Sequence, residues 1–131
     1  MKDLKPTCRI AVVQAAPVLF DKTACTDKAV RLIAECAQHG AELIVFPELF
    51  IPGYPYGMTF GFTVGARNED GRKDWQLYCG NSIVVPGPET ERLAAAAKAA
   101  QAAGIRTLNA AAAVMVSKYF SRKMAQSTMR K

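Results

Sequence analysis

Glu48 has the sequence surroundings that most clearly favour chemistry. It follows the short apolar run Leu43 to Phe46 and Pro47, and large apolar residues continue from Leu49 to Ile51. Apolar surroundings remove water from a carboxyl group and disfavour its charged form, so the group accepts a proton more readily. We therefore expect a desolvated Glu48 that can act as a general base or acid. A structural carboxylate held by an arginine or a backbone amide is the alternative.

The cysteines and the histidine are the other candidates for nucleophiles or metal ligands. No Cys-x-x-Cys pair is present, and one histidine does not complete a usual zinc site, so we expect no metal. Without a secretory signal at the start of the sequence, the thiols are expected to be reduced, and each is interpreted as a small, semi-buried apolar residue. The residues concerned are Cys8, Cys25, Cys36, Cys79 and His39.

A strand, a helix and a second strand are predicted to position Glu48. The first strand covers Cys8 to Ala15, the helix Asp21 to Gly40 and the second strand Leu43 to Phe46. Such a unit is a right-handed crossover with parallel strands, whose carboxyl ends emerge at one edge of the sheet. Ligands and catalytic groups of open α/β sheets lie at that edge, where Glu48 follows the second strand. The helix would face the sheet with Val30, Ile33, Ala34 and Ala37.

The next stretch is predicted to be a long loop followed by a helix. Glycine and proline punctuate residues Leu49 to Asn81, and the charged stretch Arg67 to Asp74 is interpreted as a solvated surface with Trp75 and Leu77 as inward anchors. Acids in the first turn and a run of alanines predict a helix over Glu89 to Ala103. A third strand is expected from Ile105, and the inner face of the helix is expected to hold Leu93, Ala97 and Ala100.

The charge distribution divides the chain into two parts. Its 131 residues are 50% hydrophobic and 21% charged, as in a single globular domain. Residues 1–105 hold eleven Lys/Arg and eleven Asp/Glu, whereas residues 106–131 hold six Lys/Arg and no acid, so the whole net charge of +6 belongs to the tail. The balanced body argues against nucleic acid as a partner. No apolar stretch is long enough to cross a membrane, and we expect a cytoplasmic protein.

Several short motifs follow one another in a characteristic order. They are Arg9 to Pro17 (RIAVVQAAP), Leu43 to Glu48 (LIVFPE), Pro52 to Pro55 (PGYP), Gly71 to Asp74 (GRKD) and Val85 to Leu93 (VPGPETERL), continued by the alanine helix up to Ile105. Together they resemble the nitrilase superfamily of carbon-nitrogen hydrolases, and PGYP resembles its nitrilase branch. The resemblance covers residues 8–105.

The resemblance implies a fold, a reaction and a set of residues. The fold would be α/β, the incomplete N-terminal part of an α-β-β-α nitrilase-type sandwich. The reaction would convert a small-molecule nitrile to a carboxylic acid and ammonia through a cysteine thioimidate and thioester, with no cofactor. Glu48 would be the general base, and Tyr54 would lie near the active-site entrance, where it would contact substrate or support Glu48. Relatives of full length form homo-oligomers.

The sequence departs from the family in its second part. The nucleophile follows a Cys-Trp-Glu pattern, which none of the four cysteines fits, and Lys123 in Arg122-Lys123-Met124 is only a faint match to the family's lysine. We therefore expect residues 1–105 to be the N-terminal portion of a carbon-nitrogen hydrolase domain and residues 106–131 a divergent basic tail, so that the chain is a truncated, inactive fragment. The alternative is a non-catalytic interaction module whose tail binds nucleic acid or an acidic partner. The sequence does not identify the nitrile or the oligomeric state.

Overall fold

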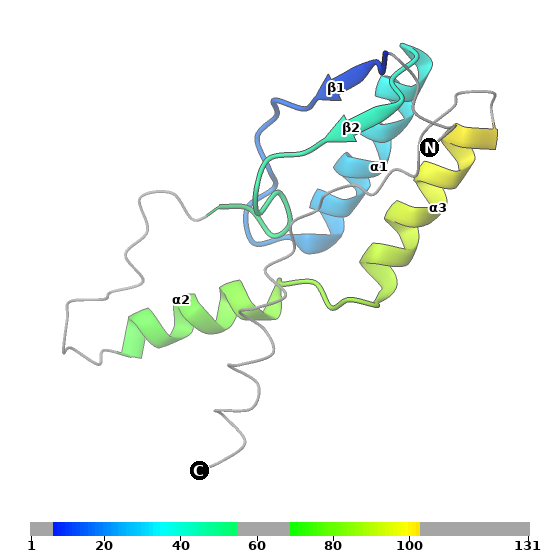
Figure 1. Ribbon diagram of the computed structural model, residues 1–131. Helices are drawn as coiled ribbons and strands as arrows, with labels where there is room; N and C mark the ends of the chain where they lie inside the picture. The colour runs from blue at the N-terminus through cyan, green and yellow to red at the C-terminus, as the bar shows by residue number, and fades with distance from the viewer. Residues whose placement is uncertain (1–6, 55–68, 103–131) are drawn as a thin grey trace, which may run out of the picture.

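A computed structural model describes residues 7–54 and 69–102 (Figure 1). Within these ranges the chain is mixed α/β, as expected for an incomplete nitrilase-type fold. The predicted strand, helix, strand unit is confirmed. The elements in chain order are β1 (Ile10–Val12), α1 (Lys22–Gln38), β2 (Leu43–Val45), α2 (Glu69–Gly80) and α3 (Pro88–Ala102).

The two strands are parallel and in tight register. Ile10 lies opposite Leu43 and Val12 opposite Val45. The pairing continues one residue further, because the amide of Val13 donates to the carbonyl of Val45 at 2.8 Å. Both carboxyl ends therefore emerge at the same edge of the sheet, and the loop that carries Glu48 begins there.

Local signals define both ends of α1. The Asp21 side chain caps the helix by accepting a hydrogen bond of 2.8 Å from the amide of Ala24. At the other end Gly40 has a φ of +77°, a conformation that favours glycine, and its amide donates to the carbonyl of Ala37. The expected inner stripe is correct for Ile33 and Ala37, but Ala34 is exposed. The buried residues of this helix are Cys25, Thr26, Ala29, Ile33 and Ala37.

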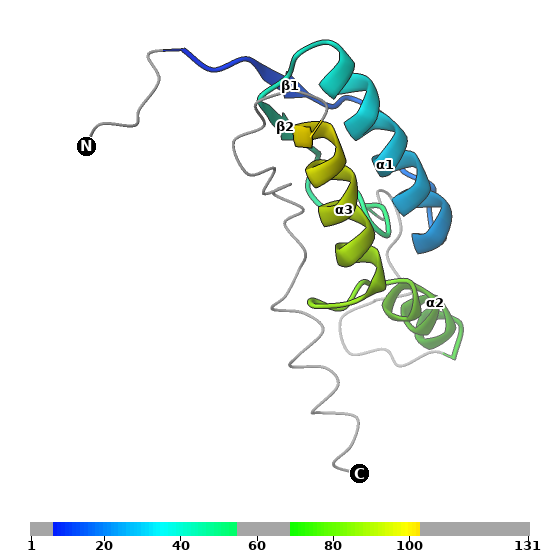
Figure 2. The ribbon, with the colours of Figure 1, turned by 90° about the vertical axis from the view of Figure 1, so that its right-hand side faces the viewer.

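Helices α1 and α3 pack side by side on one face of the sheet (Figure 2). The prediction for the inner face of α3 is confirmed, because Leu93, Ala97 and Ala100 are buried. Polar contacts join the same helices at their surface. The guanidinium of Arg92 forms an ion pair with Asp27. The ammonium of Lys22 lies 3.6 Å from a carboxylate oxygen of Glu89.

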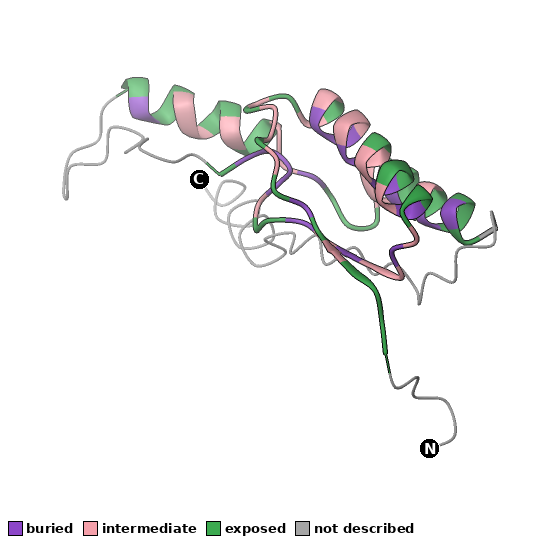
Figure 3. Ribbon diagram, turned by 90° about the horizontal axis from the view of Figure 1, so that it is seen from above, coloured by how far each residue is buried: buried purple, intermediate pink, exposed green. Residues whose placement is uncertain are grey.

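The opposite face of the sheet is open in the described ranges (Figure 3). Ile10 is 54% exposed and Val12 75% exposed, whereas Val13 and Ile44, which point toward the helices, are buried. The apolar run of the first strand is typical of a buried strand, but only one face of β1 is buried in the described residues. Parallel sheets are usually covered on both sides, and here α1 and α3 cover only one.

Helix α2 contradicts the predicted loop over Leu49 to Asn81. It spans Glu69–Gly80 and begins with two acids, Glu69 and Asp70, which interact favourably with the positive end of the helix dipole. The ring of Tyr78 packs edge-on against Phe20, with centroids 6.3 Å apart. Trp75 is partly buried as expected, but Leu77 is 49% exposed, so its assignment as an inward anchor is wrong.

Three predicted features lie outside the described residues. They are the third strand from Ile105, the boundary between residues 105 and 106, and the basic tail. Within the described residues, no helix combines the length and the apolar character that a membrane span requires.

Candidate active site

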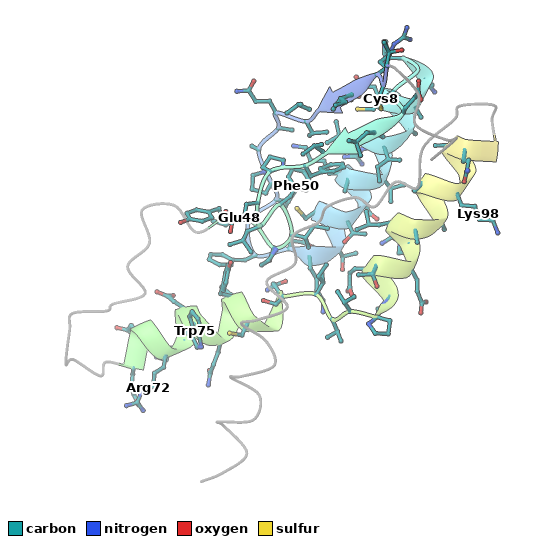
Figure 4. The ribbon with its side chains drawn as sticks, in the orientation of Figure 1. Cys8, Glu48, Phe50, Arg72, Trp75 and Lys98 are labelled. Atoms are coloured by element: carbon teal, nitrogen blue, oxygen red, sulfur yellow. The ribbon has the colours of Figure 1, made fainter. Side chains whose placement is uncertain are left out.

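The structure places Glu48 just beyond the carboxyl end of β2, as the sequence predicts (Figure 4). Strand β2 ends at Val45, and Phe46 and Pro47 lead into the turn that contains Glu48. Proline cannot donate to a strand ladder, so the chain leaves the sheet at this point. The carboxylate is thereby presented at the edge of the sheet where α/β proteins place catalytic groups.

The expected desolvation of Glu48 is wrong for the described residues. Glu48 is exposed, and the apolar residues on either side of it turn away from it into the core. Phe46, Phe50 and Ile51 are each at most 6% exposed, and the rings of Phe46 and Phe50 lie 5.1 Å apart. These side chains anchor the backbone around Glu48 and do not enclose its carboxylate. No side chain in the described ranges forms an ion pair with it.

The backbone around Glu48 forms a tight, internally bonded turn. The amide of Phe50 donates to the carbonyl of Pro47 at 3.2 Å, and the amide of Gly53 donates to the carbonyl of Leu49 at 2.9 Å. Leu49 has a φ of +53°, which is uncommon for a residue other than glycine. Strained conformations of this kind persist only where surrounding contacts enforce them, and they gather at functional sites. We call Pro47 to Gly53 the Glu48 loop.

The Glu48 loop is bound to the segment that precedes α1. The amide of Phe20 donates to the carbonyl of Pro52 at 3.2 Å. Gly53 lies against Pro17 and Leu19 and has a φ of +103°. The connection from β1 to α1 therefore supports the loop from one side.

Tyr54 follows the Glu48 loop directly and is 55% exposed. Its ring is available to a molecule that approaches this edge of the sheet. The structure thus keeps the two predicted site residues of the described ranges, Glu48 and Tyr54, on one connected segment. Lys123 lies outside the described residues.

The four cysteines occupy different positions, and all are free thiols. Cys8 is exposed before β1, Cys36 is half-buried on α1, and Cys79 is exposed near the end of α2. Cys25 is completely buried on α1, and burial raises the pKa of its thiol. Burial also raises the pKa of Cys36. A raised pKa lowers the population of thiolate, the nucleophilic form.

A groove of about 400 Å³ runs along β1 beside the second half of α1. Neither Glu48 nor Tyr54 belongs to its lining, so it is separate from the candidate site. Its polar residues include Arg9, Glu35 and His39. Two of them complete the end of α1, because the guanidinium of Arg9 donates to the carbonyl of His39 at 3.3 Å. In the described ranges, no three potential metal ligands gather in one place.

The site has the form expected of an α/β enzyme, with a candidate acid-base residue at the carboxyl edge of a parallel sheet. Comparison with known families is more specific. The model of the carbon-nitrogen hydrolase family matches residues 9–112, and the chain belongs to this family. The predicted resemblance is thereby confirmed.

Curated relatives place the chain near plant nitrilases. It is 52% identical over 92 residues to a bifunctional nitrilase/nitrile hydratase of Nicotiana tabacum and 51% identical to one of Lupinus angustifolius. It is 49% identical over 92 residues to Nitrilase 3 of Arabidopsis thaliana. Each match covers 70% of this chain but only 26–27% of the relative. The chain thus spans about a quarter of the length of the curated relatives that it matches.

Sequence reasoning missed two features that shape the site. Helix α2 carries Tyr78, whose ring packs against Phe20 in the segment before α1. The amide of Phe20 in turn donates to Pro52 in the Glu48 loop. Cys25, interpreted as a small apolar residue, also forms a hydrogen bond to the loop. The acidic start of α2 could have revealed the helix, whereas no local signal reveals a contact between residues 25 positions apart.

Proposed function

We propose that Glu48 is the general base of a nitrilase-type hydrolysis. The main support for this proposal is the position of the Glu48 carboxylate, which is exposed at the carboxyl edge of the sheet. Glu48 also lies within the region that matches the carbon-nitrogen hydrolases. An exposed carboxylate on an anchored turn can meet a thiol and a substrate that approach from the same side. The fixed backbone favours catalysis because a base contributes fully only at the correct position.

The proposed reaction proceeds through covalent catalysis. Glu48 accepts the proton of a cysteine thiol, and the thiolate adds to the nitrile carbon to form a thioimidate. Water then adds, ammonia leaves, and a second water hydrolyses the resulting thioester to the carboxylic acid and the free thiol. The family's lysine would stabilise the charged tetrahedral intermediates, and Lys123 remains a prediction for that role. The chemistry uses no metal and no organic cofactor.

The nucleophile of this reaction is proposed to be none of the four cysteines of this chain. Cys25 is completely buried, and Cys36 lies along the groove beside β1. Cys8 precedes the amino end of β1, whereas Glu48 lies at the carboxyl edge of the sheet. Cys79 stands on α2 without the sequence pattern of the family nucleophile. We therefore propose that these 131 residues do not supply the nucleophile and hydrolyse no nitrile alone.

Substrate and assembly follow from the same proposal. A small-molecule nitrile would contact Tyr54, which is exposed directly after the Glu48 loop. Assembly into homo-oligomers and a cytoplasmic location remain predictions, as does the division between residues 105 and 106.

A chimera tests the role of Glu48. Residues 9–102 of this chain would replace the matching segment of the Nicotiana tabacum relative, and ammonia, acid and amide would be measured with aromatic and aliphatic nitriles. Amide is included because the name of that relative contains nitrile hydratase. We expect the chimera to be active and Glu48→Gln to lower kcat at least about 100-fold, in the range of lost general-base catalysis.

Glu91→Gln is the matched control, because Glu91 is an exposed acid on α3. It should leave the rate within about twofold of the unsubstituted chimera, as is usual for surface substitutions. An active chimera whose Glu48→Gln variant retains full activity would contradict the role of Glu48. Nitrile hydrolysis by the purified 131-residue chain would contradict the assignment of the nucleophile.

A further inference from the structure

The thiol of Cys25 joins α1 to the Glu48 loop at the candidate site. It lies on the first turn of α1 and is completely buried. Its Sγ–H donates to the carbonyl of Phe50 in the Glu48 loop, with 2.7 Å between sulfur and oxygen. One buried side chain therefore connects the helix and the loop.

Phe50 links the thiol of Cys25 to the turn that contains Glu48. Its amide closes the turn by donating to Pro47, so Glu48 and Leu49 lie between two bonded residues. The carbonyl of Phe50 points in the opposite sense, into the core, and accepts the thiol hydrogen. The thiol thus binds Phe50, the residue whose amide closes the turn, from the side of the protein core. Leu49, at φ +53°, needs such external support.

We propose that Cys25 is a positioning residue, which sets the orientation of Glu48 by holding the carbonyl of Phe50. This inference rests on the proposed function of Glu48. Cys25 does not contact the reacting atoms, because its side chain is sealed in the core between α1 and the loop. Its contribution is the rigidity of the turn that presents the carboxylate.

The chemistry of a buried thiol suits this role. Desolvation raises the pKa of Cys25, which keeps the sulfur protonated at neutral pH and preserves the hydrogen that Phe50 accepts. Serine would keep a donor in almost the same place, whereas valine would fill the space with no donor. Packing and hydrogen bonding can therefore be separated at this position.

Three variants of the 131-residue chain make the separation: Cys25→Ser, Cys25→Val and Cys25→Ala. Backbone order in the Glu48 loop would be followed by ¹⁵N relaxation and by amide exchange of Phe50, and overall stability by urea unfolding. We expect Val and Ala to speed exchange of the Phe50 amide roughly two- to tenfold, the effect of losing one hydrogen bond. We expect Ser to restore the unsubstituted rate, even if its overall stability is lower because a hydroxyl is buried.

Cys36 supplies the matched control. It lies on the same helix, is half-buried and lines the groove beside β1, a groove whose lining includes no residue of the Glu48 loop. Cys36→Val and Cys36→Ser should leave the order of the loop unchanged. If Cys25→Val preserves the loop while Cys25→Ser loosens it, Cys25 acts by packing alone and the proposal is wrong. The same holds if loop exchange follows overall stability in every variant.

Infrared spectroscopy gives a second test, which does not depend on the folding of the Cys25 variants because Cys25 itself is retained. A chain in which Cys8, Cys36 and Cys79 are replaced by serine retains Cys25 as its single thiol. We expect its S–H stretching band below that of a simple thiol dissolved in a hydrocarbon, because donation to a carbonyl weakens the S–H bond. A band at the hydrocarbon position would overturn the proposal. These readouts do not use activity, so they remain valid if the chimera shows that Glu48 is not the base.

Discussion

Gly53 and Leu19 are in direct contact across the base of the Glu48 loop. A Cβ atom added to Gly53 would lie 2.9 Å from Cδ1 of Leu19, and the φ of Gly53 is +103°. Both the close approach and the backbone conformation require glycine at this position. The contact locks the end of the loop to the segment that leads into α1.

Gly53→Ala is therefore expected to destabilise the protein by about 1–3 kcal/mol, since it combines a strained φ with a steric conflict. Urea unfolding measures the change. Gly80→Ala is the control, because no atom lies within 4 Å of a Cβ added at Gly80. Equal effects of the two substitutions would show that the contact of Gly53 with Leu19 is unimportant.

The cap of α1 gives a second prediction. Asp21→Ala removes the side chain that accepts from the amide of Ala24, and a lost N-cap typically costs about 1 kcal/mol. Asp21→Asn keeps an acceptor oxygen and should retain most of the stability. Thermal unfolding followed by circular dichroism separates the variants. The interpretation fails if Asn and Ala are equally destabilising.

The two faces of β1 should respond differently to the same substitution. Val13 is 7% exposed and packs in the core, whereas its neighbour Val12 is 75% exposed. Val13→Thr buries a hydroxyl and is expected to cost about 1–3 kcal/mol, whereas Val12→Thr should change stability by less than about 0.5 kcal/mol. Urea midpoints of the two variants provide the comparison. A large cost at Val12 would mean that this face is covered in solution.

Stability should decrease in alkaline solution because two thiols of α1, one buried and one half-buried, have a raised pKa. Burial raises the pKa of Cys25 and Cys36 above the ordinary thiol value, so the unfolded chain releases these protons at lower pH than the folded protein. Their contribution is complete below about pH 9 and is lost as the pH rises through the raised values. Urea unfolding at about pH 7.5 and about pH 10 measures the loss, which Cys25→Val should reduce. An unchanged pH dependence in that variant would contradict the raised pKa of Cys25.

Local signals account for the parts of the fold that sequence reasoning found. Asp21 and Gly40 mark the ends of α1, and the short apolar runs around Ile10 and Ile44 mark two strands whose parallel order follows from the helix between them. The same reasoning places Glu48 at the correct edge of the sheet. These inferences need only neighbours in the chain and a general rule of topology.

The parts that sequence reasoning missed depend on contacts between distant segments. The apolar sequence neighbours of Glu48 predict a desolvated carboxylate, but Phe50 and Ile51 are buried in the core and leave the carboxylate exposed. Helix α2 was missed because its sequence is mostly charged and polar, and because Gly71 lies within it. The bond from Cys25 to Phe50 exists only after α1 has packed beside the loop.

The parallel pairing of β1 with β2 also constrains the order in which the chain folds. Ile10 meets Leu43 only after the whole of α1 has been traversed, so neither strand can form its ladder with a neighbour in sequence. Closing this long connection reduces the conformational entropy of the chain before strand pairing can stabilise the fold. Formation of α1, with its own cap and stop, would shorten that search, so nucleation is expected to begin in the helix and the sheet to assemble last.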